Sequence, residues 1–300
     1  MEDMKGLKAA EHFYRKTAER ALKKEFPDLF PRMTIGLAGE GSECFGFDDE
    51  LSRDHDFGTA LCIWLDDKDY LQFGSEVQVF YETLLKKQKI VPIQPGHHEA
   101  GDRTGVLCTG KWYQRYTGFS MGPGTAAEWE RVPEIALATA TNGVVFSGFD
   151  TAFSAVRERL LLFYPERVRI KMIAERAFTM GQAGQYNYPR CLKRADDVAS
   201  YLALSAFIQA AISMVYLLNR RYMPYYKWAF RGMTDLTILQ RVPGLLRELT
   251  ASTTDFVQKN ALVERICTLV LAELAREKLT FPGDSFLAAH QDAILSRIPD

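Results

Sequence analysis

The residues best suited to chemistry are two aspartates, Asp54 and Asp56, which are separated by a single residue. On a strand, both carboxylates would leave the same face, because side chains alternate along a strand. Two carboxylates held close together repel each other unless a cation lies between them. Mg²⁺ prefers oxygen ligands and usually binds one or two carboxylates together with the phosphates of a substrate. The pair therefore predicts a magnesium site at Asp54 and Asp56.

A glycine-rich segment, residues 39–46 (GEGSECFG), precedes the aspartates. It follows an apolar run at 33–38, which is typical of a buried strand that enters a tight turn. If Gly41 and Ser42 open a short helix, their backbone N–H groups are unpaired and face outward, with the positive end of the helix dipole behind them. Such a helix start binds anions. A phosphate loop beside an aspartate pair predicts a site for a nucleoside triphosphate and Mg²⁺; the structural alternative is an acidic loop between two strands.

These motifs resemble the signature of the nucleotidyltransferase superfamily, in which Gly-Ser is followed roughly ten residues later by Asp-x-Asp on the next strand. The longer runs 39–56 and 220–228 (RRYMPYYKW) resemble a bacterial family within that superfamily, the domain-of-unknown-function 4037 family, over nearly the whole chain. Two positions depart from the superfamily pattern. Phe45 stands where many members carry an arginine, and His55 stands between the aspartates, where an apolar residue is usual.

The resemblance implies a Mg²⁺-dependent enzyme in which Asp54 and Asp56 are both the catalytic residues and the metal ligands, while Gly41 and Ser42 bind the triphosphate. An acceptor attacks the α-phosphorus of a nucleoside triphosphate, most simply ATP, and pyrophosphate leaves. A small-molecule acceptor is favoured, and protein and RNA stay open. The alternative is a non-catalytic nucleotide-binding or regulatory protein, because the strand expected at 105–116 lacks the third carboxylate that related enzymes often carry. The nearest carboxylates are those of Glu99, Asp102 and Glu128.

Two cations further along the chain, Lys227 and Arg231, are candidates for binding the triphosphate. The helix that begins near Pro224 places them one turn apart and therefore on the same face. A triphosphate carries more negative charge than one Mg²⁺ neutralises, so a further cation is expected. Tyrosines and a tryptophan surround Lys227 in the sequence, where a base could stack. A solvated helix face paired with local acids explains the same residues.

The composition is that of an ordinary globular protein, with 300 residues of which 47% are hydrophobic. Lys and Arg total 37 against 38 Asp and Glu, so no overall field favours nucleic acid or a membrane surface. The five cysteines are dispersed, which indicates reduced thiols, and the N-terminal residues are dense in charge. A cytoplasmic protein is expected. Residues 198–218 carry no charge and reach the length of a membrane span, but a central helix of a bundle is favoured, so no membrane contact is expected.

The order of the elements predicts an α+β fold. A helix at about 4–25, strands at 33–38 and 54–65, a helix at 70–87 and a strand at 105–116 predict a small mixed-sheet, nucleotidyltransferase-like domain at 1–150. The cluster Asp66, Asp67 and Asp69 is interpreted as a helix start rather than a second metal site. From 151 onward strand signals disappear, and breakers such as the loop expected at 181–184 separate helices. An all-α helical bundle domain is expected at 151–300, and the sequence does not indicate an oligomeric state.

Overall fold

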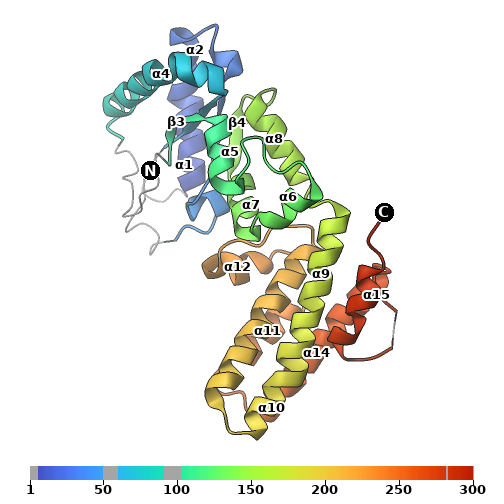
Figure 1. Cartoon of the computed structure of the whole chain (residues 1–300). Helices are drawn as coiled ribbons and strands as arrows, with labels where there is room; N and C mark the ends of the chain where they lie inside the picture. The colour runs from blue at the N-terminus through green and yellow to red at the C-terminus, as the bar shows by residue number, and fades with distance from the viewer. Residues whose placement is uncertain (1–5, 50–59, 91–102, 282, 300) are drawn as a thin grey trace. The chain divides into compact units, whose positions relative to one another are not determined.

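The computed structural model describes residues 6–49, 60–90, 103–281 and 283–299. Their contacts divide the chain into two units, residues 1–162 and residues 163–300 (Figure 1). The first unit contains a small mixed sheet with helices, and the described part of the second unit contains helices alone. The predicted α+β fold is therefore confirmed.

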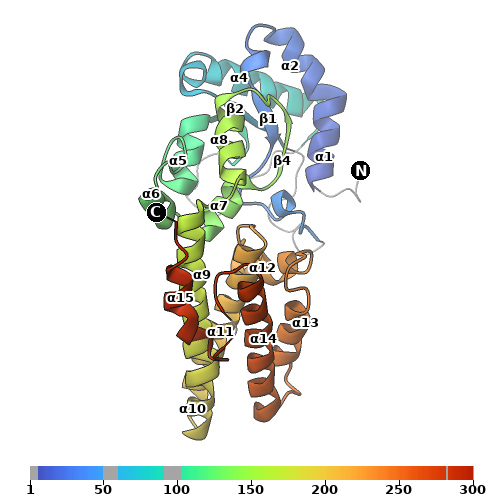
Figure 2. The ribbon, with the colours of Figure 1, turned by 90° about the vertical axis from the view of Figure 1, so that its right-hand side faces the viewer.

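The sheet of the first unit has four short strands in the order β3-β2-β1-β4. The strands are β1 (Thr34–Leu37), β2 (Cys62–Leu65), β3 (Gly105–Cys108) and β4 (Val144–Ser147). β1 lies between β2 and β4 (Figure 2) and runs antiparallel to both, whereas β2 runs parallel to β3. Every residue of β1, β2 and β3 is buried, which matches their apolar sequences. β4, at one edge of the sheet, is partly exposed, whereas β3, at the other edge, is buried.

Helices account for most of the remainder of the first unit. Its N-terminal run consists of α1 (Gly6–Phe13), a π-helical turn η1 (Tyr14–Ala18) and α2 (Glu19–Glu25), as the periodicity at 4–25 predicts. The crossover helix α4 (Asp67–Lys87) joins β2 to β3, and α5 (Thr109–Thr117), α6 (Ala126–Arg131), α7 (Glu134–Thr141) and α8 (Ala152–Leu161) follow. Trp64 of β2 stacks on Phe153 of α8, with ring centroids 3.9 Å apart, and Trp112 and Tyr113 of α5 pack against the same ring. These aromatic contacts join the sheet to α5 and α8.

The strand predicted at 105–116 is wrong beyond Cys108, where the chain turns directly into α5. Asp67 in the first turn of α4 accepts a hydrogen bond from the N–H of Gly110, at 3.0 Å, and so satisfies a donor at the start of α5. A side chain at position 110 would collide with this carboxylate, since a Cβ there would lie 2.7 Å from both of its oxygens. The sequence pattern of residues 109–116 fits either a strand or a helix, and the contact between α4 and α5 favours the helix.

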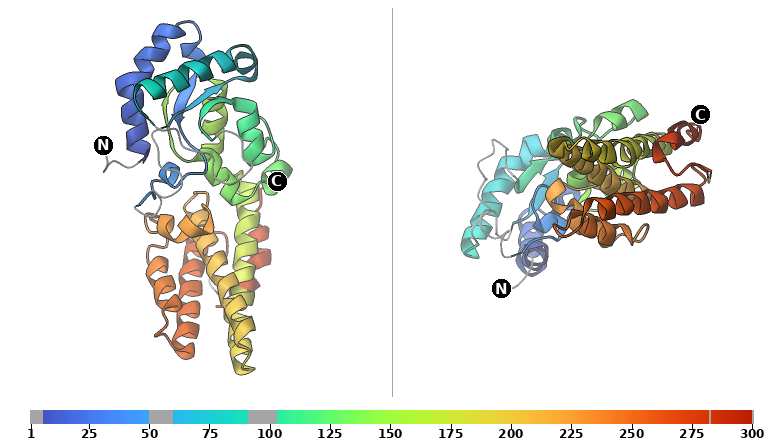
Figure 3. Two further views of the ribbon diagram at one scale, coloured as in Figure 1. Left: turned by 90° about the vertical axis from the view of Figure 1, so that its left-hand side faces the viewer. Right: turned by 90° about the horizontal axis from the view of Figure 1, so that it is seen from below.

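The second unit is a bundle whose main helices are α9 (Glu166–Met180), α11 (Asp197–Leu218), α13 (Val242–Thr250) and α14 (Phe256–Arg276). α9 packs along α11, and α13 packs along α14 (Figures 2 and 3). The shorter elements are η5 (Gly181–Asn187), α10 (Tyr188–Lys193), α12 (Tyr226–Met233), η6 (Leu287–His290) and α15 (Gln291–Leu295). By length and composition α11 is able to cross a membrane, and 56% of its apolar window is buried within the protein. One such helix is weak evidence for a membrane span, because a core helix has the same composition.

The loop predicted at 181–184 is wrong, because η5 continues the helical path from α9 into α10. Gly184 lies against the ring of Phe207 on α11, so closely that a Cβ would come within 2.3 Å of a ring carbon. A Cβ at Gly181 would meet the backbone nitrogen of Ala288 at 2.5 Å. These glycines therefore allow close packing of neighbouring elements and do not mark a break in the helix.

A buried arginine connects three helices of the second unit. The side chain of Arg169 on α9 is only 1% exposed. Its guanidinium pairs with Glu166 at 2.8 Å and with Glu277, just after α14, at 2.5 Å. It also donates to the carbonyl of Leu217 near the end of α11, at 3.1 Å. A buried charge is stable only when it is paired and hydrogen-bonded, as it is here.

Candidate functional site

Four segments of the first unit meet at one end of the strands of the sheet. The strand registers place Gly36 beside Cys62, Cys62 beside Gly105, and Leu37 beside Val144. The end of β1 therefore lies next to the starts of β2, β3 and β4. We call this the loop edge, because the glycine-rich loop, residues 39–46, follows β1 directly.

The glycine-rich loop is fastened to the residues before β4. Gly39 donates its N–H to Oδ1 of Asn142 at 2.8 Å, and Nδ2 of Asn142 donates back to the Gly39 carbonyl at 2.6 Å. Further along the loop, the carbonyl of Cys44 accepts a hydrogen bond from the N–H of Gly143 at 2.8 Å. The loop is thus held at both ends by the Asn-Gly turn that leads into β4.

Ser42 begins a single 3₁₀ turn, η3 (Glu43–Phe45). Its backbone is already helical, and its carbonyl accepts from the N–H groups of Phe45 at 3.2 Å and Phe47 at 2.9 Å. Within the described residues, the N–H groups of Gly41 and Ser42 donate no hydrogen bond. The short helical start expected at Gly41 and Ser42 is present, with Gly41 buried and Ser42 half-buried.

A buried ion pair that the sequence motifs did not reveal lies against this turn. Nη2 of Arg103 is 2.5 Å from Oε1 of Glu43, and the two side chains are only 17% and 10% exposed. A Cβ at Gly41 would lie 1.9 Å from that nitrogen and 2.1 Å from that oxygen, so the pair fills the space a side chain would need. Gly41 is therefore required for the approach of a guanidinium. Arg103 comes just before β3. Because β3 runs parallel to β2, the start of β3 and therefore Arg103 lie at the loop edge.

The thiols and the tyrosine hydroxyl behind the loop are neutral at physiological pH. Burial raises the pKa of the Cys62 thiol to about 12, and burial also raises the pKa of Cys44. The pKa of the Tyr116 hydroxyl is likewise raised, chiefly by burial. Neutral thiols are poor nucleophiles, so neither cysteine is poised for covalent catalysis. Among the described residues, charged side chains of the loop edge include the pair Glu43 and Arg103, and Arg157, which donates to the Gly143 carbonyl at 3.2 Å; the pair Arg115 and Glu40, 2.9 Å apart, lies nearby.

The predicted metal ligands Asp54 and Asp56 lie outside the described residues, as do Glu99 and Asp102. The described chain resumes at Ala60 and enters β2 at Cys62. In the described part of the chain, no group of three or more His, Cys, Asp and Glu side chains is arranged to hold a metal ion. That result does not bear on the aspartate pair, whose role stays a prediction.

The other candidate carboxylates of the first unit have structural partners. Glu128 closes a capping box with Thr125 at the start of α6, and hydrogen bonds from the backbone of Gly124 and Thr125 lower its pKa. Asp66 is the N-cap of α4 and accepts from the N–H of Asp69 at 2.7 Å, while Asp69 pairs with Arg32 at 3.1 Å. The interpretation of the 66–69 cluster as a helix start is confirmed.

Lys227 and Arg231 lie on α12 of the second unit. The ammonium of Lys227 is 5.0 Å, and the guanidinium of Arg231 is 5.7 Å, from the ring centre of Trp228. Both cations therefore contact one aromatic ring and share a face of α12, as expected from their spacing. Gly41 and Ser42 belong to the first unit, so the role of Lys227 and Arg231 toward a triphosphate stays a prediction.

The chain matches one family model, described as "Domain of unknown function (DUF4037)", over residues 129–229. No curated protein and no solved structure matches it. The matched residues begin in α6 and end within α12, so they include the run 220–228 and exclude the glycine-rich loop and the aspartate pair. The expected resemblance to this family is supported, over a shorter stretch than the nearly whole chain that was expected.

Proposed function

We propose that the protein is a Mg²⁺-dependent nucleotidyltransferase, which transfers a nucleoside monophosphate from a triphosphate, most simply ATP, to an acceptor. The observation that carries this proposal is the meeting of the glycine-rich loop and the start of β2 at the loop edge. Asp56 precedes Ala60 by only four residues, which span at most about 14 Å when fully extended. In this proposal the short connection holds Asp54 and Asp56 near the edge at which Gly41 and Ser42 lie.

The donors at the loop edge suit the phosphates of a nucleotide. Two aspartates supply the oxygen ligands that Mg²⁺ prefers, and the bound ion would neutralise phosphate charge and polarise the α-phosphate. The N–H groups of Gly41 and Ser42 would donate to phosphate oxygens and hold them in place. Positioning and charge neutralisation provide most of the catalysis in phosphoryl transfer, so this set does not need a covalent nucleophile.

Arg103 supplies the further cation that a triphosphate requires. A guanidinium carries five N–H donors in a fork and can bind a carboxylate and a phosphate at the same time. Its contact with Glu43 holds the guanidinium against Gly41, close to the backbone donors of the loop. In this proposal Arg103 takes the place of the arginine that many nucleotidyltransferases carry after Gly-Ser, where this chain has Phe45.

A second candidate function is nucleotide binding without transfer. It is favoured by one observation: β3, with the sequence GVLC, carries no carboxylate. Related enzymes often place a third carboxylate on such a strand, as a metal ligand or as a general base. A small-molecule acceptor remains the favoured one for the transfer reaction.

Thermal unfolding with ATP and Mg²⁺ tests the site. A ligand that binds only the folded state raises Tm, so wild type should melt higher with Mg²⁺ and ATP together than with either alone. Asp54→Asn and Asp56→Asn should each remove this shift and leave Tm without ligand nearly unchanged. Asp28→Asn, at an exposed position before β1, is the matched control and should keep the shift. Equal shifts in all four proteins would refute the metal assignment.

Turnover separates the two candidate functions. Wild type is incubated with each α-labelled nucleoside triphosphate, Mg²⁺ and a cell extract, and products are identified by mass spectrometry. A transferred nucleotide that the two aspartate variants do not produce establishes the enzyme. Binding with no transferred nucleotide and no pyrophosphate establishes the nucleotide-binding protein.

A further inference from the structure

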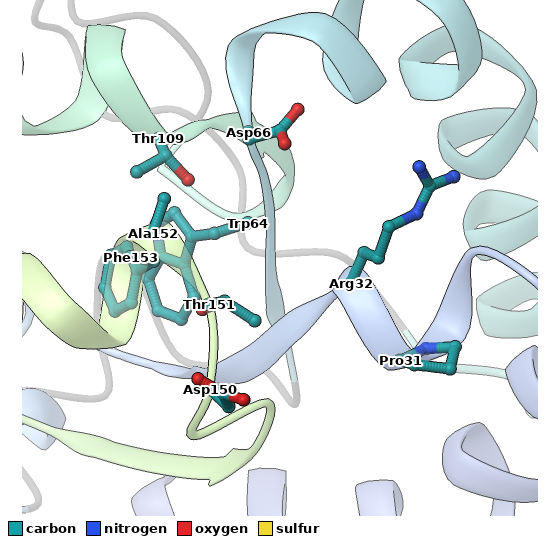
Figure 4. Close-up of a pocket in the computed structure, with 9 residues that line it drawn as sticks. All are labelled: Pro31, Arg32, Trp64, Asp66, Thr109, Asp150, Thr151, Ala152 and Phe153. Carbon is teal, nitrogen blue, oxygen red and sulfur yellow. The ribbon is translucent and has the colours of Figure 1, made fainter.

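A pocket of about 240 Å³ lies in the first unit, between the residues before β1 and the starts of α5 and α8 (Figure 4). Polar side chains on its wall have structural partners. Arg32 pairs with Asp69, and Asp66 and Thr151 cap α4 and α8. These side chains are therefore explained by the fold. The exposed apolar surface of the second unit is not.

That surface is one end of the helical bundle, which we call the α10 end. α10 packs against both α11 and α14, and the first turns of α11 and α14 lie beside it (Figures 1 and 2). Large apolar side chains of these turns and of η5, just before α10, are exposed by 47% to 80%. They are Tyr186, Val198, Tyr201, Leu202, Phe256 and Val257.

The first turns of α11 show most clearly that a partner is missing. Val198, Tyr201 and Leu202 lie three and four residues apart and therefore share a face of the helix, and each is about 70% exposed. No charged residue occurs from 198 to 218. Only 56% of the apolar window of α11 is buried within the chain. Because the outer face of a soluble helix normally carries charged and polar residues, this face has the composition of a covered surface.

The exposed area is large enough for a protein partner. At their exposed fractions, the three aromatic side chains alone present about 350 Å², taking roughly 200 Å² for each whole side chain. A standard protein interface buries roughly 800 Å² on each partner. The aromatic residues supply nearly half of that area, and their aliphatic neighbours add to it. The surface therefore suits a reversible complex of moderate affinity.

The charges of the α10 end indicate which partner fits. Three basic residues and three acidic residues are exposed there: Arg190, Lys193 and Arg194, and Asp196, Asp197 and Asp255. Because the two signs balance, the same surface of a second copy meets it without net repulsion, and a two-fold axis lets basic groups face acidic ones. Asp197 and Asp255 directly precede Val198 and Phe256, so an anionic membrane would repel carboxylates at the points of contact.

We propose that the α10 end binds the same end of a second copy of this chain and forms a two-fold symmetric dimer. The apolar faces of the two α11 helices would cover each other, and the charged residues would form the rim of the interface. The dimer is independent of the proposed nucleotidyltransferase activity, because it uses none of the loop-edge residues.

Sedimentation velocity of the full-length protein, from about 1 to 200 µM, tests the dimer. Wild type should associate with a Kd in the micromolar range, as expected for an interface of this size. Leu202→Glu and Phe256→Glu should each weaken association by about tenfold or more, because each places a carboxylate inside the interface. Leu71→Glu is the control, since Leu71 is 84% exposed on α4 of the first unit, and should associate like wild type. A wild type that is monomeric throughout, or unchanged association in both glutamate variants, would refute the proposal.

A second test uses the charges. Arg194→Glu makes the α10 end net negative and Asp197→Lys makes it net positive, so each variant alone should associate more weakly than wild type. Mixed together, the two variants should form a heterodimer about tenfold more tightly than either associates with itself. A mixture that associates no better than the separate variants would exclude this surface as a self-interface. If wild type instead stays monomeric and binds phosphatidylglycerol vesicles that Leu202→Glu does not bind, the partner is a membrane and the dimer is wrong.

Discussion

The pair Arg103 and Glu43 stabilises the fold and, in the proposed function, also provides a cation for the triphosphate. Exchanging the two charges separates these roles. Arg103→Gln leaves the buried carboxylate of Glu43 without this cation and should lower the free energy of unfolding by about 2–3 kcal/mol. The double variant Arg103→Glu, Glu43→Arg restores opposite charges and should recover part of that loss. It moves the cation from one side of Gly41 to the other, so affinity for Mg²⁺ and ATP should stay low. Urea unfolding and calorimetry measure the two effects.

The control for this exchange is the pair Arg115 and Glu40, whose side chains are 28% and 46% exposed. Arg115→Gln should change the free energy of unfolding by less than about 1 kcal/mol, because exposed ion pairs contribute little. If the exchanged pair regains both stability and wild-type ATP affinity, Arg103 has a structural role only.

At the level of single residues, the sequence predicts the local part of the candidate site and does not predict the distant part. Gly41 and Ser42 were found because their neighbours alone predict a strand that ends in a turn. Arg103 was missed because its partner Glu43 is 60 residues away. Asn142 was missed for the same reason, since it lies 103 residues from Gly39. No local pattern records such a contact; it follows from the strand registers.

Asn142 gives a prediction about the glycine-rich loop as an element. Asn142→Ala removes two hydrogen bonds to Gly39 and should lower the free energy of unfolding by about 1–3 kcal/mol. It should also weaken binding of Mg²⁺ and ATP, because the loop donors lose their fixed position. The control is Asn219→Ala, which removes a similar pair of bonds to the backbone of Ile238 and a third to the Val215 carbonyl. A comparable loss of stability is expected there, with ATP affinity unchanged. Equal ATP affinities in both variants would show that the tie to β4 does not position the loop.

Arg169 gives a prediction about the helices of the second unit. Arg169→Ala leaves Glu277 without that cation and removes the bond to the Leu217 carbonyl, so the free energy of unfolding should fall by about 3–5 kcal/mol. Circular dichroism during urea unfolding measures the change. Arg276→Ala is the control, since the Arg276 side chain is 64% exposed and pairs within its own helix. A loss as large at Arg276 would mean that burial is not what makes Arg169 important.

The elements themselves were predictable where one pattern dominates and not where two patterns compete. The N-terminal helix and α4 follow from apolar periodicity, and β1 follows from its β-branched run. The segment after Cys108 was mistaken for strand because Trp112 and Tyr113 suit either element until Asp67 caps a helix there. β4 was missed because it is short and follows an Asn-Gly pair that reads as a turn. Gly181 and Gly184 indicate a loop by residue type alone, although their neighbours require glycine inside a helix.

The whole molecule should lose stability at alkaline pH. Burial raises the pKa of Cys62 to about 12 and raises the pKa values of Tyr81 and Tyr113. In the unfolded chain these groups ionise near their ordinary values of about 8.5 and about 10. Below about pH 8 both states are protonated and stability is constant. As the pH rises further, the unfolded state loses protons that the folded state keeps, so the free energy of unfolding falls by about 1.4 kcal/mol per pH unit for each such group.

Urea unfolding in the presence of a reductant, from pH 7 to pH 11, measures this slope. Cys62→Ala removes one buried thiol, so the decline between about pH 8.5 and pH 10 should become shallower. Cys191→Ala is the control, because Cys191 is only partly buried. A stability that stays constant up to pH 11 would contradict the assignment of these groups as buried and protonated.

The pairing of β1 with β4 has a consequence for how the protein is made. β1 is central in the sheet, yet its partner on one side is synthesised last, with Gly39 and Asn142 separated by 103 residues. At a synthesis rate of about 5–20 residues per second, about 5–20 s pass between the two. During that interval one flank of β1 has no native neighbour, and such exposed strands attract chaperones or aggregate. The glycine-rich loop thus leaves the ribosome well before its partner segment and is among the last parts of its unit to reach its final form.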